Sequence, residues 1–214
     1  MNAELVFRQA LEHLPLVAIL RGLRPQDAVA VGQSLWRSGW RMLEVPLNSP
    51  DPLQSIALLV DALPQALVGA GTVLSSHQVR EVHQAGGRLI VSPHFDPDVL
   101  STTLKLGLVC LPGVLTPTEA FGALQLGASG LKLFPAEACT PAVLKAMRAV
   151  LPPAAVVLPV GGIQLEHLAG WRQAGASGLG LGSAVYRPGQ SALEVERQAQ
   201  GWAQAWATSA PLQA

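Results

Sequence analysis

The segment VVLPVGGIQLEHLAGWRQAGASGLGLGS, residues 156–183, contains one complete strand–helix–strand repeat. Val156–Gly162 and Gly178–Ser183 are short apolar runs bounded by glycine, which is the pattern of a buried β-strand. The residues between them have the pattern of a helix that ends at Ala174, because Gly175 follows and glycine is the usual residue just past a helix. Apolar strands joined by helices indicate a parallel sheet.

Six further runs of the same kind precede this segment, and consecutive strands start 20 to 26 residues apart. They are Leu16–Leu20, Met42–Leu47, Leu67–Val73, Leu89–Pro93, Val109–Val114 and Gly130–Pro135. Eight strand–helix units predict an α/β fold, a single-domain (β/α)8 TIM barrel that spans residues 1–214. The alternative is an open doubly wound sheet. It is disfavoured because the first strand is not followed by GxGxxG and the chain has no GxxxxGK[ST] motif.

Both ends of the chain fit the barrel. Asn2–His13 has the pattern of an extra N-terminal helix, and we expect residues 1–14 to lie across the lower opening of the barrel. After Gln190, apolar residues recur at helical intervals and predict the last outer helix. No shift in composition divides the chain into domains.

The composition excludes several classes of protein. The formal net charge is +0 and only 13% of the residues are charged, so the dense cationic face of a nucleic-acid-binding protein is not expected. Neither a membrane-spanning run nor a secretory leader is predicted. The two cysteines, Cys110 and Cys139, have no metal-binding or redox spacing, which fits a cytoplasmic protein.

Lys132 is the first candidate catalytic residue. The chain has 14 basic residues, of which only three are lysines, and this one lies inside an apolar strand between Leu131 and Leu133. If the leucines face the helices, strand alternation directs the ammonium group into the barrel. A buried lysine that is neutral near pH 7 is a Schiff-base nucleophile. The alternative is a lysine whose charged end reaches solvent along its aliphatic stem.

Glu44 is the second candidate, because it is the only charge in Met42–Leu47. Two opposite charges inside one barrel could form a purely structural ion pair. They could also be a nucleophile and its acid/base partner, which the inner strand positions of both residues favour.

Anion-binding groups are expected at the same end of the barrel. Arg21 directly follows the first strand and could bind a carboxylate through two hydrogen bonds. Gly161-Gly162 and Gly182-Ser183 follow the last two strands, where barrels of this kind bind phosphate through backbone N–H groups. The five histidines are scattered without a ligand pattern, so neither a metal nor another cofactor is predicted. Ser183 has no partner for a hydrolytic triad.

Motifs in all eight predicted strands, in chain order, resemble those of the class I 2-keto-3-deoxy-6-phosphogluconate/galactonate aldolase family. They are Leu16–Gly22 (LVAILRG), Leu43–Pro50 (LEVPLNSP), Val68–Leu74 (VGAGTVL), Val91–Pro93 (VSP), Pro112-Gly113, Gly130–Pro135 (GLKLFP), Val160–Gly162 (VGG) and Gly180–Ser183 (GLGS). The resemblance covers nearly the whole chain. It implies a homotrimeric Schiff-base lyase that splits a phosphorylated 2-keto-3-deoxy sugar acid into pyruvate and glyceraldehyde 3-phosphate.

The resemblance also implies a role for each candidate. Lys132 would form the Schiff base, Glu44 would be the general acid/base, and Arg21 and Thr72 would hold the pyruvate end. The phosphate would lie on Gly161, Gly162, Gly182 and Ser183.

Asn48 and Val160 would set the sugar specificity, because the gluconate branch generally has arginine and threonine there. The resemblance therefore implies the galactonate branch, with side activity on the gluconate epimer. Two other functions stay open: another phosphate-binding barrel enzyme, such as a sugar-phosphate epimerase or decarboxylase, and a barrel that serves only as a binding scaffold.

Overall fold

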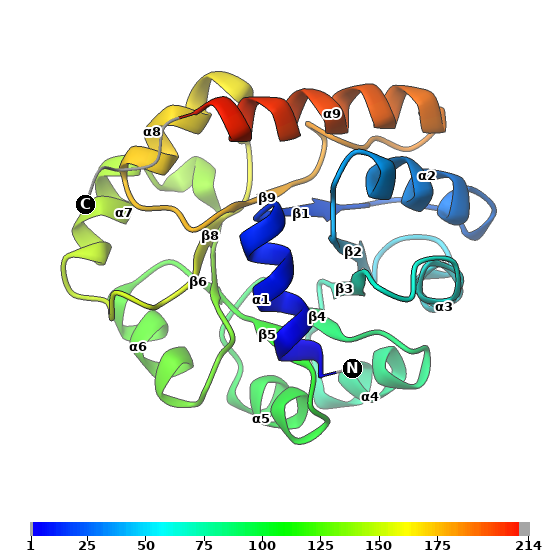
Figure 1. Ribbon diagram of the computed structural model, residues 1–214. Helices are drawn as coiled ribbons and strands as arrows, with labels where there is room; N and C mark the ends of the chain where they lie inside the picture. The colour runs from blue at the N-terminus through cyan, green and yellow to red at the C-terminus, as the bar shows by residue number, and fades with distance from the viewer. Residues whose placement is uncertain (1, 210–214) are drawn as a thin grey trace.

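The computed structural model describes residues 2–209 and has parallel strands at its centre with helices around them (Figure 1). The strands are β1 (Leu16–Ile19), β2 (Met42–Pro46), β3 (Leu67–Gly71), β4 (Leu89–Val91), β5 (Val109–Leu111), β6 (Gly113–Val114), β7 (Leu131–Leu133), β8 (Val157–Pro159) and β9 (Leu179–Leu181). All paired strands within this part of the chain are parallel. The predicted parallel α/β architecture is therefore confirmed.

Helices connect nearly all of the strands. They are α1 (Ala3–His13), α2 (Pro25–Arg37), α3 (Pro52–Ala62), α4 (Ser76–Gln84), α5 (Pro97–Lys105), α6 (Pro117–Gln125), α7 (Pro141–Arg148), α8 (Leu168–Gln173) and α9 (Ala192–Thr208), with short 3-10 turns η1 (Ala136–Ala138) and η2 (Leu165–His167). The helix expected before Gly175 is α8, and this glycine has the left-handed φ of 93° that stops a helix.

The strands form two sheets, where the sequence predicts a single barrel of eight strands. Six strands pair in the order β5-β4-β3-β2-β1-β9 and three in the order β6-β7-β8. The expected strand Val109–Val114 divides at Pro112, because proline has no N–H to donate to a neighbouring strand. The Pro112 carbonyl still accepts a hydrogen bond from the N–H of Lys132 at 2.9 Å. Between β8 and β9, a single parallel bridge joins Val160 to Gly180.

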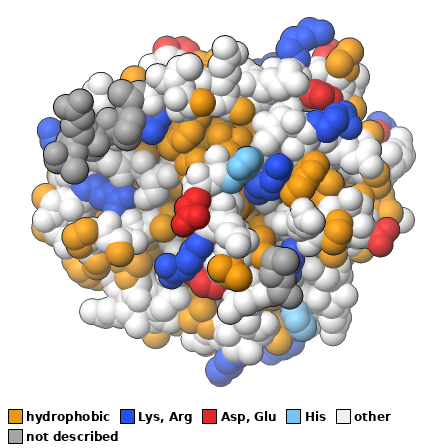
Figure 2. Space-filling view, in the orientation of Figure 1, with side chains coloured by type: hydrophobic (Ala, Val, Ile, Leu, Met, Phe, Trp, Pro, Cys, Tyr) orange, Lys and Arg blue, Asp and Glu red, His pale blue; other side chains and the backbone are white. Residues whose placement is uncertain are grey.

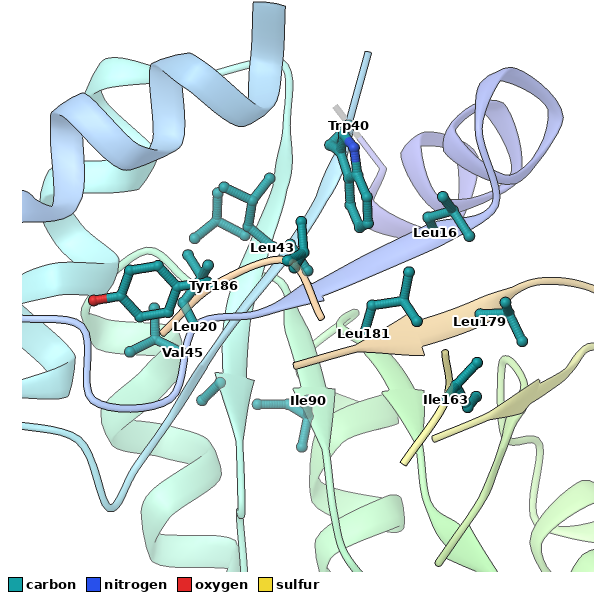
Figure 3. Close-up of a cluster of buried hydrophobic side chains, with 14 of the residues drawn as sticks. Leu16, Leu20, Trp40, Leu43, Val45, Ile90, Ile163, Leu179, Leu181 and Tyr186 are labelled. Atoms are coloured by element: carbon teal, nitrogen blue, oxygen red, sulfur yellow. The ribbon is translucent and has the colours of Figure 1, made fainter. Parts of the chain in front are cut away.

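Two apolar layers lie on opposite sides of the strands, because successive side chains of a strand point to opposite faces. The outer layer fills the space beneath the helices; Figure 3 shows part of it, including Leu16, Leu43 and Leu181. Leu131 and Leu133 belong to this outer layer, as expected. The inner layer joins the other strand face to α1.

Helix α1 contributes its apolar side to the inner layer. Ala3, Val6, Phe7 and Ala10 of this helix are buried against strand residues such as Met42, and Phe7 is only 1% exposed. Figure 1 shows α1 crossing one end of the strands. Because α1 covers the inner strand face at that end, we expect a site between the strands to open at the opposite end, where the strands finish.

The surface carries few charges. Figure 2 shows Lys, Arg, Asp and Glu side chains scattered over the face that α1 crosses, with apolar atoms between them. None of the helices within residues 2–209 combines the length and the apolar run that a membrane span requires.

Candidate active site

One cavity of about 540 Å³ opens where the strands end, and every predicted site residue lines it. These residues are Arg21, Glu44, Asn48, Thr72, Lys132, Val160, Gly161, Gly162, Gly182 and Ser183. They come from loops and strands that are distant in sequence. The topology brings them together because parallel strands all finish at the same end.

Lys132 lies on the inner face of β7, opposite the two outward leucines, and is only 7% exposed. Its Nζ is 4.7 Å from the centre of the Phe134 ring, which is cation–π distance. Lys132 and Glu44 also line a small void of about 10 Å³ between the strands, room for a single water molecule. The low exposure is contrary to a lysine whose charged end reaches bulk solvent.

Glu44 lies on the inner face of β2 and is 3% exposed. Its carboxylate packs directly against Gly71 of β3, where any side chain would overlap it. Burial raises the pKa of Glu44, while the positive charges of Lys132 and Arg21 act in the opposite direction. The ion pairs within residues 2–209 do not include Lys132 with Glu44, so the two groups are not joined in a closed structural pair.

Arg21 is held by the loop that follows the neighbouring strand. Its Nη1 donates a hydrogen bond to Oδ1 of Asn48 at 3.0 Å, and the N–H of Gly22 donates to Oγ of Ser49 at 2.9 Å. These two bonds tie the loop after β1 to the loop after β2. Arg21 is exposed toward the cavity and can receive an anion.

Thr72 follows β3 and has a φ of 58°. A β-branched residue rarely adopts this left-handed conformation, which costs about 1–3 kcal/mol. The next residue is fixed by a hydrogen bond from the N–H of Val73 to the carbonyl of Val91. Backbone strain at a cavity wall is typical of functional sites.

The glycine loops form the opposite wall of the cavity. Gly161 and Gly162 both have positive φ, 116° and 58°. The carbonyl of Gly182 accepts hydrogen bonds from the N–H groups of Val185 and Tyr186, so a helical turn begins there. The N–H groups of Gly182 and Ser183 therefore stand at the start of a turn, the arrangement that proteins use to bind anions.

Sequence reasoning missed three charged or aromatic residues that also line this cavity: Glu137, Tyr186 and Arg187. Glu137 lies in η1, and Arg187 donates a hydrogen bond from Nε to the carbonyl of Ser183 at 3.0 Å. All three follow the ends of β7 or β9. A search of every residue that follows a predicted strand end would have found them.

Neither cysteine offers a reactive thiolate. Both are free and buried, and burial raises the pKa of the Cys110 thiol to about 12. Within the described part of the chain, no three His, Cys, Asp or Glu side chains gather as a metal site would require. The chemistry that this cavity offers is that of a buried amine, a buried carboxylate, an arginine and an anion-binding loop.

Comparison with known proteins places these features in a family. Residues 7–197 match the family described as KDPG and KHG aldolase. A probable 2-dehydro-3-deoxy-6-phosphogalactonate aldolase of Rhizobium meliloti is 46% identical over 86% of this chain and 88% of that protein. The 2-dehydro-3-deoxy-6-phosphogalactonate aldolase of Escherichia coli is 45% identical over 90% of this chain and 95% of that protein.

Solved structures agree. The structure described as native KDPGal superimposes with a TM-score of 0.90 at 44% identity and covers 92% of this chain and 96% of its own. A KDPG aldolase from Legionella pneumophila, with pyruvate captured at low pH as a covalent carbinolamine intermediate, has a TM-score of 0.83 at 26% identity. It covers 95% of this chain and 98% of its own.

Proposed function

The chain is an aldolase of the KDPG and KHG family, and on that premise we propose that it cleaves 2-dehydro-3-deoxy-6-phosphogalactonate to pyruvate and D-glyceraldehyde 3-phosphate. The observation that carries this proposal is the placement of Lys132 and Glu44, both buried in one cavity and not paired with each other. The 45% and 46% identity to galactonate-type relatives supports the choice of substrate. Membership of this aldolase family argues against the alternative functions, which were an epimerase, a decarboxylase and a binding scaffold.

Lys132 is the nucleophile in this proposal. Its neutral amine adds to the C2 ketone to form a carbinolamine, and loss of water gives an iminium ion. When the C3–C4 bond breaks, its electron pair moves toward the iminium nitrogen and leaves an enamine. The carbinolamine captured in the Legionella pneumophila relative supports this route.

Glu44 is the proposed general acid/base. It takes the proton of the C4 hydroxyl, through a water molecule, as the aldehyde leaves, and it later returns a proton to C3 of the enamine. Water then hydrolyses the iminium, which releases pyruvate and restores the Lys132 amine. The raised pKa of Glu44 suits this role, because an acid/base works best when its pKa is near the working pH.

The remaining residues position the substrate. Arg21 binds the carboxylate, and Thr72 lines the pyruvate end beside it. The phosphate lies on the backbone N–H groups of Gly161, Gly162, Gly182 and Ser183. Asn48 and Val160 contact the middle of the sugar chain and favour the galactonate epimer over the gluconate epimer.

We also propose that the two sheets act as one closed (β/α)8 barrel in a single domain of residues 1–214. Only Pro112 separates β5 from β6, and the bridge from Val160 to Gly180 joins the other two edges. Helix α1, within residues 1–14, would close the lower end, as its buried residues indicate. Residues 1 and 210–214 lie outside the described part of the chain. We also propose that the protein assembles as a homotrimer and is located in the cytoplasm.

Trapping the covalent intermediate tests the mechanism. Pyruvate and borohydride should leave one reduced adduct on the intact protein, and peptide mapping should place it on Lys132. Lys132→Arg is the matched control and should remain unlabelled, because a guanidinium does not form the imine. A label on Lys105 or Lys145, or no label at all, would contradict the proposal.

A further inference from the structure

An acidic side chain occupies the wall where the phosphate is expected. Glu137 lines the active cavity, and its carboxyl group packs against the two glycines that follow β8. A Cβ added to Gly161 would lie 2.9 Å from Cδ of Glu137, and one added to Gly162 would lie 2.5 Å from its Cγ. The two glycines thus leave the space that this side chain fills.

The backbone fixes Glu137 in this position. The N–H of Ala136, the preceding residue, donates to the carbonyl of Val160 at 2.9 Å, and the N–H of Ala138 donates to that of Pro135 at 3.0 Å. These bonds hold η1 beside the end of β8. The side chain itself makes no ion pair or hydrogen bond within residues 2–209, and the residue is exposed, so its carboxylate can move without breaking either kind of bond.

A second cavity gives the side chain room to move. This cavity, of about 420 Å³, shares Glu137, Gly161, Gly162 and Ile163 with the active cavity. Glu137 therefore stands on the boundary between the two. A change of side-chain rotamer would carry the carboxylate out of the active cavity, whereas the backbone would stay in place.

We propose that Glu137 competes with the substrate phosphate for the Gly161-Gly162 subsite and so determines how strongly the enzyme prefers phosphorylated substrates. The inference rests on the proposed function. Even in water, the repulsion between two negative groups about 4 Å apart weakens binding of the second group about fivefold. A phosphate must displace the carboxylate before it binds, whereas an unphosphorylated aldehyde need not.

Glu137→Gln tests this proposal, because it keeps the shape of the side chain and removes its charge. In the condensing direction with pyruvate, kcat/KM for glyceraldehyde 3-phosphate relative to unphosphorylated glyceraldehyde should rise about fivefold or more. Exchange of the pyruvate methyl protons should stay unchanged, since that step involves no phosphate. Glu166→Gln is the matched control, because Glu166 is an exposed acid that lines only the second cavity.

Direct binding separates this inference from the proposed function. Calorimetry with inorganic phosphate should show about fivefold tighter binding to the Glu137→Gln protein than to wild type, whatever the enzyme cleaves. The inference would be overturned if the kcat/KM ratio and the phosphate affinity of Glu137→Gln were equal to or lower than those of wild type. An equal gain in phosphate affinity in Glu166→Gln would overturn it as well. If wild type forms no pyruvate adduct but the phosphate affinities differ as stated, the proposed function fails and the competition stands.

Discussion

The guanidinium of Arg21 donates a hydrogen bond to the side-chain oxygen of Asn48 over 3.0 Å. An asparagine side chain has one oxygen that accepts and one NH2 group that donates. Because the oxygen accepts the bond from Arg21, the NH2 group remains available to donate a hydrogen bond to the substrate. Asn48 therefore contacts the residue expected to bind the carboxylate and is itself expected to contact the sugar.

The first prediction concerns this connection. Asn48→Ala should raise KM for pyruvate about tenfold in methyl-proton exchange and leave kcat nearly unchanged, because Arg21 loses the acceptor that orients it. Asn48→Asp keeps an oxygen in reach of Arg21 and serves as the matched variant, with a smaller rise expected. Exchange kinetics across a pyruvate titration measure both. Equal KM values for wild type and Asn48→Ala would show that Arg21 is positioned without this bond.

Gly71 gives a second prediction, because its lack of a side chain makes room for the Glu44 carboxylate. Gly71→Ala should displace Glu44 and slow proton exchange at least tenfold, while pyruvate and borohydride still label Lys132. Forcing a methyl group into such a contact also destabilises the protein by about 1–3 kcal/mol.

Gly201→Ala is the control for that experiment. Gly201 lies in α9, and a Cβ added there would meet no atom within 4 Å. This variant should keep full exchange activity and be slightly more stable, because alanine favours the helix. Retention of wild-type exchange in Gly71→Ala would argue against a fixed position for the carboxylate.

Most of the framework was predictable from sequence because its signals are local. Short apolar runs and glycine stops indicate strands and helices, and alternation along β7 places Lys132 opposite Leu131 and Leu133. The break between β5 and β6 could have been anticipated from Pro112, which lacks the N–H that a continuous strand needs.

The missed features depend on contacts between distant segments. Glu137 reaches the glycine loop because the N–H of Ala136 bonds to the carbonyl of Val160, and no local sequence pattern predicts a contact between such distant residues. The bond from Arg21 to Asn48 likewise joins two loops, 27 residues apart. Strand order brings such residues together, so their contacts follow from the fold rather than from a motif.

The third prediction follows from the raised pKa of Glu44, which burial causes. Below the pKa of an unfolded glutamate, about 4.3, the carboxyl group is protonated in both the folded and unfolded states, and burial of charge costs nothing. As the pH rises through the higher folded value, the native protein loses stability. Glu44→Gln should therefore be more stable than wild type at neutral pH, with the difference vanishing near pH 4.

Denaturant midpoints between pH 4 and pH 8 would measure that trend. Thermal unfolding would show the same trend, because in a protein of this size each kcal/mol of added stability raises Tm by roughly 2–4 °C. The same variant should still form the imine with pyruvate but exchange its methyl protons far more slowly. A stability difference that grows toward acid pH would contradict a raised pKa, and normal exchange would remove Glu44 from the acid/base role.

The fourth prediction is a homotrimer. Only 13% of the residues are charged, and large apolar side chains such as Leu74, Leu115 and Leu165 are between 38% and 50% exposed. Such a surface favours contact between subunits, and the family resemblance supplies the number three. Light scattering at micromolar concentration should give three times the chain mass of 22.4 kDa. A monomeric mass would refute the expectation.

The last prediction concerns which epimer is cleaved. The galactonate and gluconate substrates differ only in the configuration at C4, so the residues that face this hydroxyl decide. Val160 is 8% exposed, lines the active cavity and packs against Gly180, and it can donate no hydrogen bond to an inward hydroxyl. Threonine has the same shape with a hydroxyl group. One hydrogen bond of this kind is worth about 1–3 kcal/mol, or roughly 5- to 150-fold in preference.

Wild type should therefore have a higher kcat/KM for the galactonate epimer and a measurable rate with the gluconate epimer. Val160→Thr should shift the ratio toward gluconate by about fivefold or more. Adding Asn48→Arg should shift it further but also raise KM for pyruvate, because Arg21 would lose its acceptor and face a second guanidinium. The single valine variant is thus the cleaner test. A wild-type ratio of galactonate to gluconate at or below one would overturn the substrate assignment, and the Lys132 chemistry would be unaffected.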